Sequence, residues 1–172
     1  MESPSPGISL PASTFVHLRA ALADVCGEPR AIQALQAAGF AAGESIAALL
    51  VTEAEAAAGT FWRRMGAHFE HSGWGSLHHA APHPGVEVLS SPDWSEADVG
   101  AGGPGASCAF TTGLFSRILS TVASAPVSVL EIECRSRGDR RCAFAIGAED
   151  TLHRLYGHLV GDEALDEVLG RL

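Results

Sequence analysis

The sequence predicts an α+β domain in which an antiparallel sheet of about four strands packs against a layer of helices. Apolar residues recur at helical spacing through most of the chain before Gly73, whereas short extended runs separated by turn residues follow it. A further helical segment, residues 108–123, is followed directly by a pattern typical of a β-hairpin. Helices and strands segregated in this way favour an antiparallel sheet covered by helices.

Two helices are expected before residue 51. The first ends near residue 25, and its apolar residues recur on one face: Phe15, Leu18, Leu22 and Val25. The second covers residues 30–50, where Gly39 and Gly43 interrupt the apolar pattern. Because glycine has no side chain, these two positions would let the backbone of another element approach closely.

A third helix is expected over residues 53–71. Thr52 and Glu55 have the spacing of a capping box at its start. Its apolar side includes Phe61, Trp62, Met65 and Phe69. Such aromatic residues are more typical of a core than of a pocket, but a domain that holds an apolar molecule uses the same side chains for both.

Two short strands are expected at residues 77–81 and 86–89. The turn residues Pro82, Pro84 and Gly85 lie between them, which favours antiparallel pairing. A loop over residues 91–105 then leads to the fourth helix, for which Ser107 is a candidate N-cap. Helices over residues 149–160 and a short one to residue 169 complete the expected elements.

The segment from Glu131 to Cys142 carries the most specific signal. An apolar run, residues 127–132, leads into Cys134, and a second apolar run begins at Cys142, so each arm of the expected hairpin carries one cysteine. Cys108 lies 23 positions before Glu131, which completes the pattern C-x22-E-x2-C-x7-C. Three thiolates and one carboxylate suit a tetrahedral Zn2+ ion, and such a closed set of ligands indicates a structural rather than a catalytic site.

The fourth ligand is not decided by spacing alone. On a regular strand Glu131 and Cys134 point to opposite faces, so both reach one ion only if the strand bulges or ends near Glu133. Glu133 is the alternative ligand. Ordinary buried thiols are the competing interpretation of the three cysteines, and Cys26 has no place in the pattern.

Composition narrows the class of protein. At 172 residues the chain is long enough for one domain that buries about 70 % of its unfolded surface, and we expect a loose arm over residues 1–12 and a single domain over residues 13–172. The net charge of -9 argues against direct binding to nucleic acid. No secretory leader or membrane-spanning run is expected, and four cysteines without a leader indicate a reducing, cytoplasmic compartment.

The cysteine spacing, together with the string Glu-x-x-Cys-x-x-x-Gly-Asp-x-x-Cys from Glu131 to Cys142, resembles the 4-vinyl reductase domain family. Members of this family bind small molecules. They occur as sensors of phenols and xylenes, in an accessory protein of bacteriochlorophyll synthesis and as free-standing proteins. The family's fold is similar to that of the core subunits of the Golgi tethering complex TRAPP.

The resemblance implies roles for individual residues. It implies zinc ligation by Cys108, Glu131, Cys134 and Cys142, and a homodimer. It also implies a pocket for an apolar or aromatic ligand, which we expect to include Trp94, His68, Ile118, Val129, Leu114 and Trp62. Ile118 and Val129 stand where the phenol sensors have aromatic residues, which favours a larger or more aliphatic pocket than one for phenol.

Three functions follow as hypotheses. The first is a zinc-containing sensor or binding domain that holds an apolar, aromatic or tetrapyrrole-like ligand, is not an enzyme, and signals to a separate protein. The second is an accessory protein or reductase component of tetrapyrrole synthesis; against it, no Gly-rich dinucleotide loop follows a strand. The third is a structural tethering protein with a filled core.

Overall fold

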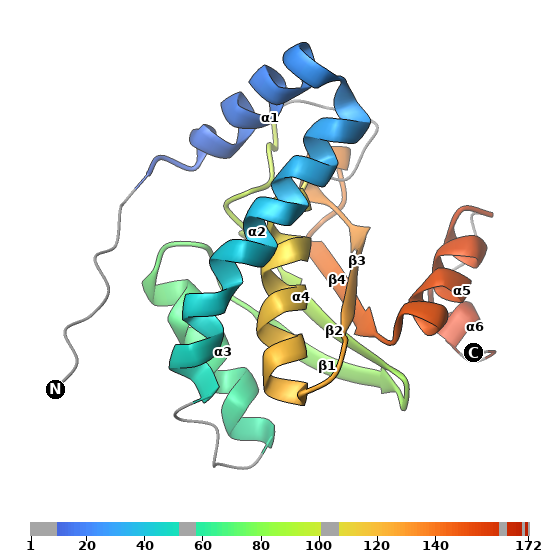
Figure 1. The fold of residues 1–172 in the computed structure, drawn as a ribbon. Helices are drawn as coiled ribbons and strands as arrows, with labels where there is room; N and C mark the ends of the chain where they lie inside the picture. The colour runs from blue at the N-terminus through green and yellow to red at the C-terminus, as the bar shows by residue number, and fades with distance from the viewer. Residues whose placement is uncertain (1–9, 52–57, 101–106, 162–164, 170, 172) are drawn as a thin grey trace, which may run out of the picture.

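The computed structural model describes residues 10–51, 58–100, 107–161, 165–169 and 171 (Figure 1). Within them the predicted α+β fold is confirmed: a four-stranded antiparallel sheet has the order β1-β2-β4-β3. The strands are β1 (His78–His83), β2 (Val86–Ser91), β3 (Ser128–Glu133) and β4 (Cys142–Gly147). The helices are α1 (Ser13–Cys26), α2 (Glu28–Val51), α3 (Ala58–His71), α4 (Ala109–Ala123), α5 (Glu149–Leu159) and α6 (Leu165–Leu169), with a 3₁₀ turn, η1 (Arg135–Arg137).

The sheet separates two apolar cores. Because side chains alternate along a strand, Leu89 and its β4 partner Phe144 face α2, α3 and α4. Val88 and its β4 partner Ala145 face the other way, where Leu155 of α5 packs against them. The large core, which includes most of the buried aromatic residues, lies on the side of α4.

Helices α2 and α4 cross in direct backbone contact, as the glycines of the second helix predicted. A Cβ atom on Gly39 would lie 2.0 Å from the carbonyl oxygen of Phe110, and one on Gly43 would lie 2.8 Å from that of Leu114. Gly113 of α4 is equally close packed, since its Cβ would lie 1.9 Å from the carbonyl oxygen of Gln36. The contact therefore needs glycine on both helices.

Two details differ from the predicted elements. Strand β1 continues through Pro82 to His83, with a register shift between Ala80 and His83, so the turn is shorter than expected. Proline is tolerated there because β1 is an edge strand, where one side of the backbone needs no hydrogen-bonding partner. The predicted capping box of Thr52 and Glu55 lies outside the described residues, as does most of the predicted arm.

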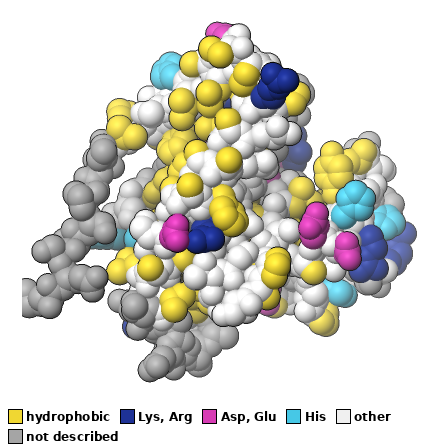
Figure 2. Space-filling model, in the orientation of Figure 1, with side chains coloured by type: hydrophobic (Ala, Val, Ile, Leu, Met, Phe, Trp, Pro, Cys, Tyr) yellow, Lys and Arg dark blue, Asp and Glu magenta, His cyan; other side chains and the backbone are white. Residues whose placement is uncertain are grey.

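Helix α2 is apolar along its whole length. By length and composition alone its 24 residues could cross a membrane, so the expectation that no run approaches that length was wrong. Core helices share this property, and the glycine face of α2 packs on α4. Figure 2 shows apolar side chains along α2 and around its junction with α1.

Candidate metal centre and adjoining cavity

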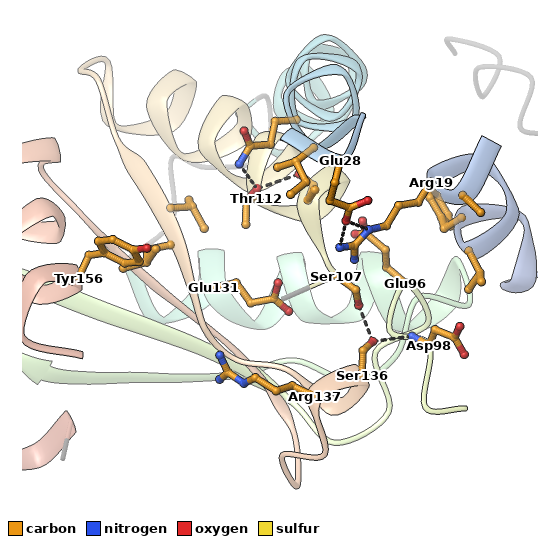
Figure 3. A pocket seen from close by; sticks show the side chains of 18 residues that line it. Arg19, Glu28, Glu96, Asp98, Ser107, Thr112, Glu131, Ser136, Arg137 and Tyr156 are labelled. Atoms are coloured by element: carbon orange, nitrogen blue, oxygen red, sulfur yellow. Dashed lines mark hydrogen bonds and ion pairs between the residues drawn. The ribbon is translucent and has the colours of Figure 1, made fainter. Parts of the chain in front are cut away.

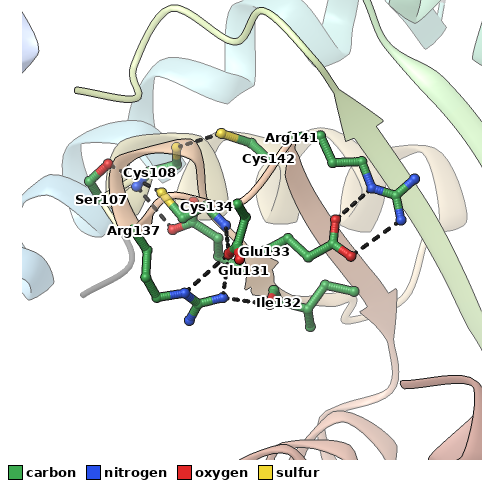
Figure 4. A network of polar contacts seen from close by, with 10 residues as sticks. Ser107, Cys108, Glu131, Ile132, Glu133, Cys134, Arg137, Arg141 and Cys142 are labelled. Carbon is green, nitrogen blue, oxygen red and sulfur yellow. Dashed lines mark hydrogen bonds and ion pairs between the residues drawn. The ribbon is translucent and has the colours of Figure 1, made fainter. Parts of the chain in front are cut away.

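The four predicted metal ligands come together at one end of the sheet. One ligand atom from each of Cys108, Glu131, Cys134 and Cys142 lies within 4.8 Å of the others (Figure 4). All three thiols are fully buried. Cys108 comes from the start of α4, Glu131 from β3, Cys134 from the end of β3 and Cys142 from the start of β4.

A bulge brings Glu131 and Cys134 to the same side. The pairing of β3 with β4 passes from Glu131 opposite Phe144 to Glu133 opposite Ala143, which leaves Ile132 as an extra residue. This is the irregularity that the alternation of a regular strand required. Glu133 points away from the sulfurs and forms an ion pair with Arg141 at 2.5 Å, so Glu131 is the carboxylate of the cluster.

The loop between Cys134 and Cys142 holds its shape through its own residues. Gly138 has φ +98°, a conformation that side chains disfavour. The carboxylate of Asp139 accepts a hydrogen bond from the Cys134 backbone N–H at 2.8 Å and pairs with Arg137. Arg137 also donates to the carbonyl oxygen of Ile132 at 2.9 Å. The Gly-Asp of the sequence string thus supports the loop that presents Cys134.

Two distant carboxylates cap α4. The predicted cap by Ser107 was wrong, because Cys108 is the N-cap and the Ser107 hydroxyl turns to Ser136 and to Cys134 Sγ, 3.4 Å away. Glu131 instead accepts from the Cys108 N–H at 3.0 Å, and Glu96 accepts from the N–H groups that follow. A full negative charge at a helix N-terminus is favoured by the helix dipole more than a neutral hydroxyl is.

The electrostatics of the cluster favour a cation. Hydrogen bonds from Cys108 and Cys142 lower the pKa of Cys134, whereas the bonds of Cys108 to the other two sulfurs raise its own pKa. Burial, and then the negative charge of Cys134, raise the pKa of Glu131 to about 9. The structure alone therefore carries one preferred thiolate, and the other groups hold protons that a divalent ion would displace.

The geometry of the cluster also fits a metal. Two thiolates about 2.3 Å from a tetrahedral ion lie roughly 3.8 Å apart, and Cys108 Sγ and Cys142 Sγ are 3.8 Å apart. The buried Oε1 atom of Glu131 has no hydrogen-bond partner, although its other oxygen has one. A buried acceptor without a partner is costly, and a metal ion would satisfy it.

An aromatic cluster lies under the metal centre. Trp94 is fully buried, and its ring centroid lies 5.4 to 5.6 Å from those of Phe69, Trp74 and Phe115. Its indole N–H donates to Thr111 Oγ1 at 2.8 Å, and that hydroxyl donates to Glu96. Burial raises the pKa of Glu96 to about 7, against the hydrogen bonds from Thr111 and Phe110 that lower it.

The residues expected to contact a ligand are spread over several sites. Leu114 and Ile118 are buried in the large core with Trp94. Trp62 stacks on His79 at 4.0 Å, and His68 meets Phe69 edge-on while burial and then His71 lower its pKa. Val129 alone among the six lines the larger cavity of the described residues. Their role as a joint pocket stays a prediction.

This cavity has a volume of about 820 Å³. It lies between α1, α2, the start of α4 and β3, and Tyr156 of α5 also lines it (Figure 3). Its polar wall contains Glu131, Glu96, Ser107, Ser136 and Asp98. Ser136 Oγ accepts from the Asp98 N–H at 2.7 Å and contacts Ser107, so this wall reaches the metal centre through Ser107 and Cys134.

Sequence reasoning missed Glu96 and the cavity wall. Glu96 is only 3 % exposed, yet its position in an acidic loop two residues after Trp94 suggested an ordinary surface carboxylate. A single acidic residue in a loop carries no signal of the helix that it caps. Asp139, by contrast, was visible beside Gly138 in the string, although its bond to Cys134 N–H was not inferred.

Comparisons with known proteins agree with this geometry. Residues 96–148 match the family model of the 4-vinyl reductase domain, so the predicted resemblance is confirmed for this part of the chain. No curated protein matches the chain by sequence.

Two solved structures share the fold. One is the phenol-responsive sensory domain of the transcription activator PoxR with phenol, at a TM-score of 0.68 and 18% identity, covering 84% of this chain and 79% of that chain. Another is a vinyl-4-reductase family protein from Methanocaldococcus jannaschii, at a TM-score of 0.56 and 15% identity, covering 81% of this chain and 82% of that chain. At these identities the likeness is one of fold.

Proposed function

We propose, from the family match and the shared fold, that this chain is a zinc-containing domain that binds a small molecule and signals to a separate protein. The observation that carries the proposal is the meeting of three thiols and one carboxylate within 4.8 Å, inside the matched residues. The fold of the PoxR sensory domain supports a sensing role. The site offers no obvious catalytic arrangement, because all four candidate ligands would be used by the ion.

In this proposal Zn2+ is structural. Cys108, Glu131, Cys134 and Cys142 would hold it, and the bound ion would supply the positive charge that keeps the three thiols deprotonated together. It would tie α4 to both arms of the β3–β4 hairpin. The chain's own residues do the rest: Asp139 orients the loop of Cys134, and Glu131 holds the N-terminus of α4.

Ligand binding would reach a partner through α4. Helix α4 contacts the metal centre through Cys108, the aromatic cluster through Thr111, and α2 through Gly113. A ligand that binds one arrangement of these helices better than another shifts the population toward it. We propose that the chain acts as a homodimer in the cytoplasm, with the exposed apolar residues Leu18 and Phe40 of α1 and α2 available for contact.

Native mass spectrometry tests the proposal directly. It reports metal, co-purified ligand and oligomeric state in one measurement. We expect one zinc ion per chain and a dimer, and Cys142→Ser should lose the metal, whereas Cys26→Ser, outside the cluster, should keep it. Metal-free protein that folds normally, together with no thermal shift for any apolar, aromatic or tetrapyrrole ligand, would count against the proposal.

The enzymatic alternative has its own test. The family name, and that of the Methanocaldococcus jannaschii relative, refer to a reductase. Reduction needs a hydride donor, and the sequence has no Gly-rich dinucleotide loop after a strand. Turnover of a vinyl-tetrapyrrole by the purified chain with a nicotinamide would replace the sensor proposal with this one.

A further inference from the structure

The space for a ligand lies outside the aromatic cluster. Trp94 and Phe115 are fully buried against each other and their neighbours, so their surroundings are filled by rings. The cavity between α1, α2, α4 and β3 is about 820 Å³, within the range of roughly 300 to 1,000 Å³ that is usual for small-molecule sites. The site for a ligand is therefore better sought there.

The cavity has an apolar side. Val16 and Ala20 of α1, Ile32 of α2, and Val129 and Leu130 of β3 line it. These residues have no hydrogen-bonding side chains, so they favour the hydrocarbon part of a ligand. The apolar lining comes from both α1 and the body of the domain, so an apolar group could contact both.

The charged side of the cavity is acidic. Both arginines of the lining are already ion-paired, Arg19 with Glu28 and Arg137 with Asp139. Among the described residues no cationic side chain forms an ion pair with Glu96 or Asp98, which also line the cavity. The lining therefore presents carboxylates without positive partners, as Figure 3 shows on one side of the cavity.

Glu96 is the stronger of these two groups. It is only 3 % exposed, and its oxygens accept three hydrogen bonds, from Phe110 N–H, Thr111 N–H and the Thr111 hydroxyl. A carboxylate has about four acceptor positions, so roughly one remains. A buried carboxylate that has hydrogen bonds but no cation still carries an uncompensated charge, which a cationic ligand would offset.

We propose that this cavity binds an amphipathic cation, a small molecule with an apolar body and a protonated amine that approaches Glu96 and Asp98. The inference rests on the proposed function and names its ligand class. The amine would lie beside the carboxylates, and the apolar body would lie against Val129, Leu130 and the inner side of α1. Because Glu96 also holds Thr111, which holds Trp94, the bound amine would act on the aromatic cluster and on α4.

A matched series of probes tests the charge. Calorimetric titration of the metal-loaded chain would use 4-phenylbutylamine, 4-phenylbutan-1-ol and 4-phenylbutyrate, which share one apolar body. We expect the amine to bind about tenfold more tightly than the alcohol, since one favourable charge contact is worth about 1.4 kcal/mol, and the carboxylate to bind most weakly. Equal affinities, or no binding by any of the three, would overturn the inference.

Two pairs of variants test the location. Ala20→Trp fills the cavity from an exposed position of α1, and Ala21→Trp is its control, since Ala21 is also exposed and does not line the cavity. Asp98→Asn removes one charge and keeps an acceptor oxygen, and Asp24→Asn removes a charge from an exposed residue elsewhere on α1. We expect Ala20→Trp to abolish amine binding and Asp98→Asn to weaken it about tenfold, with both controls unchanged.

The outcomes separate this inference from the proposed function. If the alcohol or phenol binds and Ala20→Trp has no effect, the chain is a small-molecule binder with a different site, and the inference is wrong. If Ala20→Trp breaks a dimer and leaves amine binding intact, a second copy rather than an amine covers the cavity. Neither result bears on the zinc content, which native mass spectrometry measures separately.

Discussion

Helices α1 and α4 are similar in length, but the protein treats them in opposite ways. Eight residues of α4 are buried, whereas α1 has no buried residue. Helix α4 is held at its start by Glu96 and Glu131 and at its middle by the glycine contact with α2. Helix α1 is held mainly by Phe15, which contacts Trp74 and Phe110 at 5.2 Å, and by the Arg19–Glu28 pair.

This difference assigns different tasks to the two helices. A helix that carries a metal ligand must be held in place, because a small displacement of Cys108 would open the cluster. A helix that lines one side of a cavity and buries little can move at low cost. We therefore expect changes in α4 to lower stability strongly, and changes on the exposed face of α1 to lower it very little.

Metal removal should have the largest effect on this contrast. A ligand present at about 1,000 times its dissociation constant stabilises the native state by about 4 kcal/mol, so a chelator should lower the free energy of unfolding by that order. Thermal melting with and without the chelator measures it. Cys26→Ser should respond to the chelator as the wild type does, and an unchanged melting temperature in the wild type would remove the metal from the account of α4.

Gly113→Ala should come next. The added Cβ would meet the carbonyl oxygen of Gln36 at 1.9 Å, and backbone atoms of two packed helices cannot both give way, so we expect a loss of about 3 kcal/mol or more. Gly157→Ala in α5 is the matched control. A Cβ there meets nothing within 4 Å, so alanine should stabilise the protein by roughly 0.5–1 kcal/mol through helix propensity. Urea unfolding of both variants decides whether the α2–α4 contact holds α4.

Thr111→Val should have an intermediate effect. It keeps the shape of the side chain but leaves the buried indole N–H of Trp94 without its acceptor, which costs about 1–3 kcal/mol. Thr121→Val is the control, because Thr121 is exposed and its hydroxyl bonds only to the carbonyl oxygen of Arg117. Chemical unfolding followed by tryptophan fluorescence measures both. Equal losses would mean that the Glu96–Thr111–Trp94 chain of hydrogen bonds does not fix α4.

Leu18→Gln in α1 should have the smallest effect. Leu18 is 45% exposed, so we expect a change of less than about 0.5 kcal/mol in the stability of the monomer. Phe15→Ala, which removes the contacts with Trp74 and Phe110, should cost more than Leu18→Gln on the same helix. Thermal melting at several protein concentrations compares them. A concentration-dependent loss in Leu18→Gln alone would show that a second copy covers the exposed face of α1.

The sequence by itself determined the elements and the ligands of the cluster. Helix and strand bounds follow from local periodicity, and the predicted α2 to α5 segments agree with the structure within a few residues over the part that it describes. The residue types and spacing of Cys108, Cys134 and Cys142 pointed to one metal site because such spacing is rare in ordinary cores. Gly39 and Gly43 correctly predicted a close backbone contact, since glycine in an apolar helix needs a reason.

Only the tertiary structure decided how these parts meet. The bulge at Ile132 selected Glu131 over Glu133, and the cap of α4 came from Glu96 rather than from the adjacent Ser107. Both depend on residues distant in sequence, so no local pattern encodes them. The position of the cavity depends likewise on how far α1 stands from β3. That distance is set by the packing of whole elements, where the sum of many contacts outweighs any single residue.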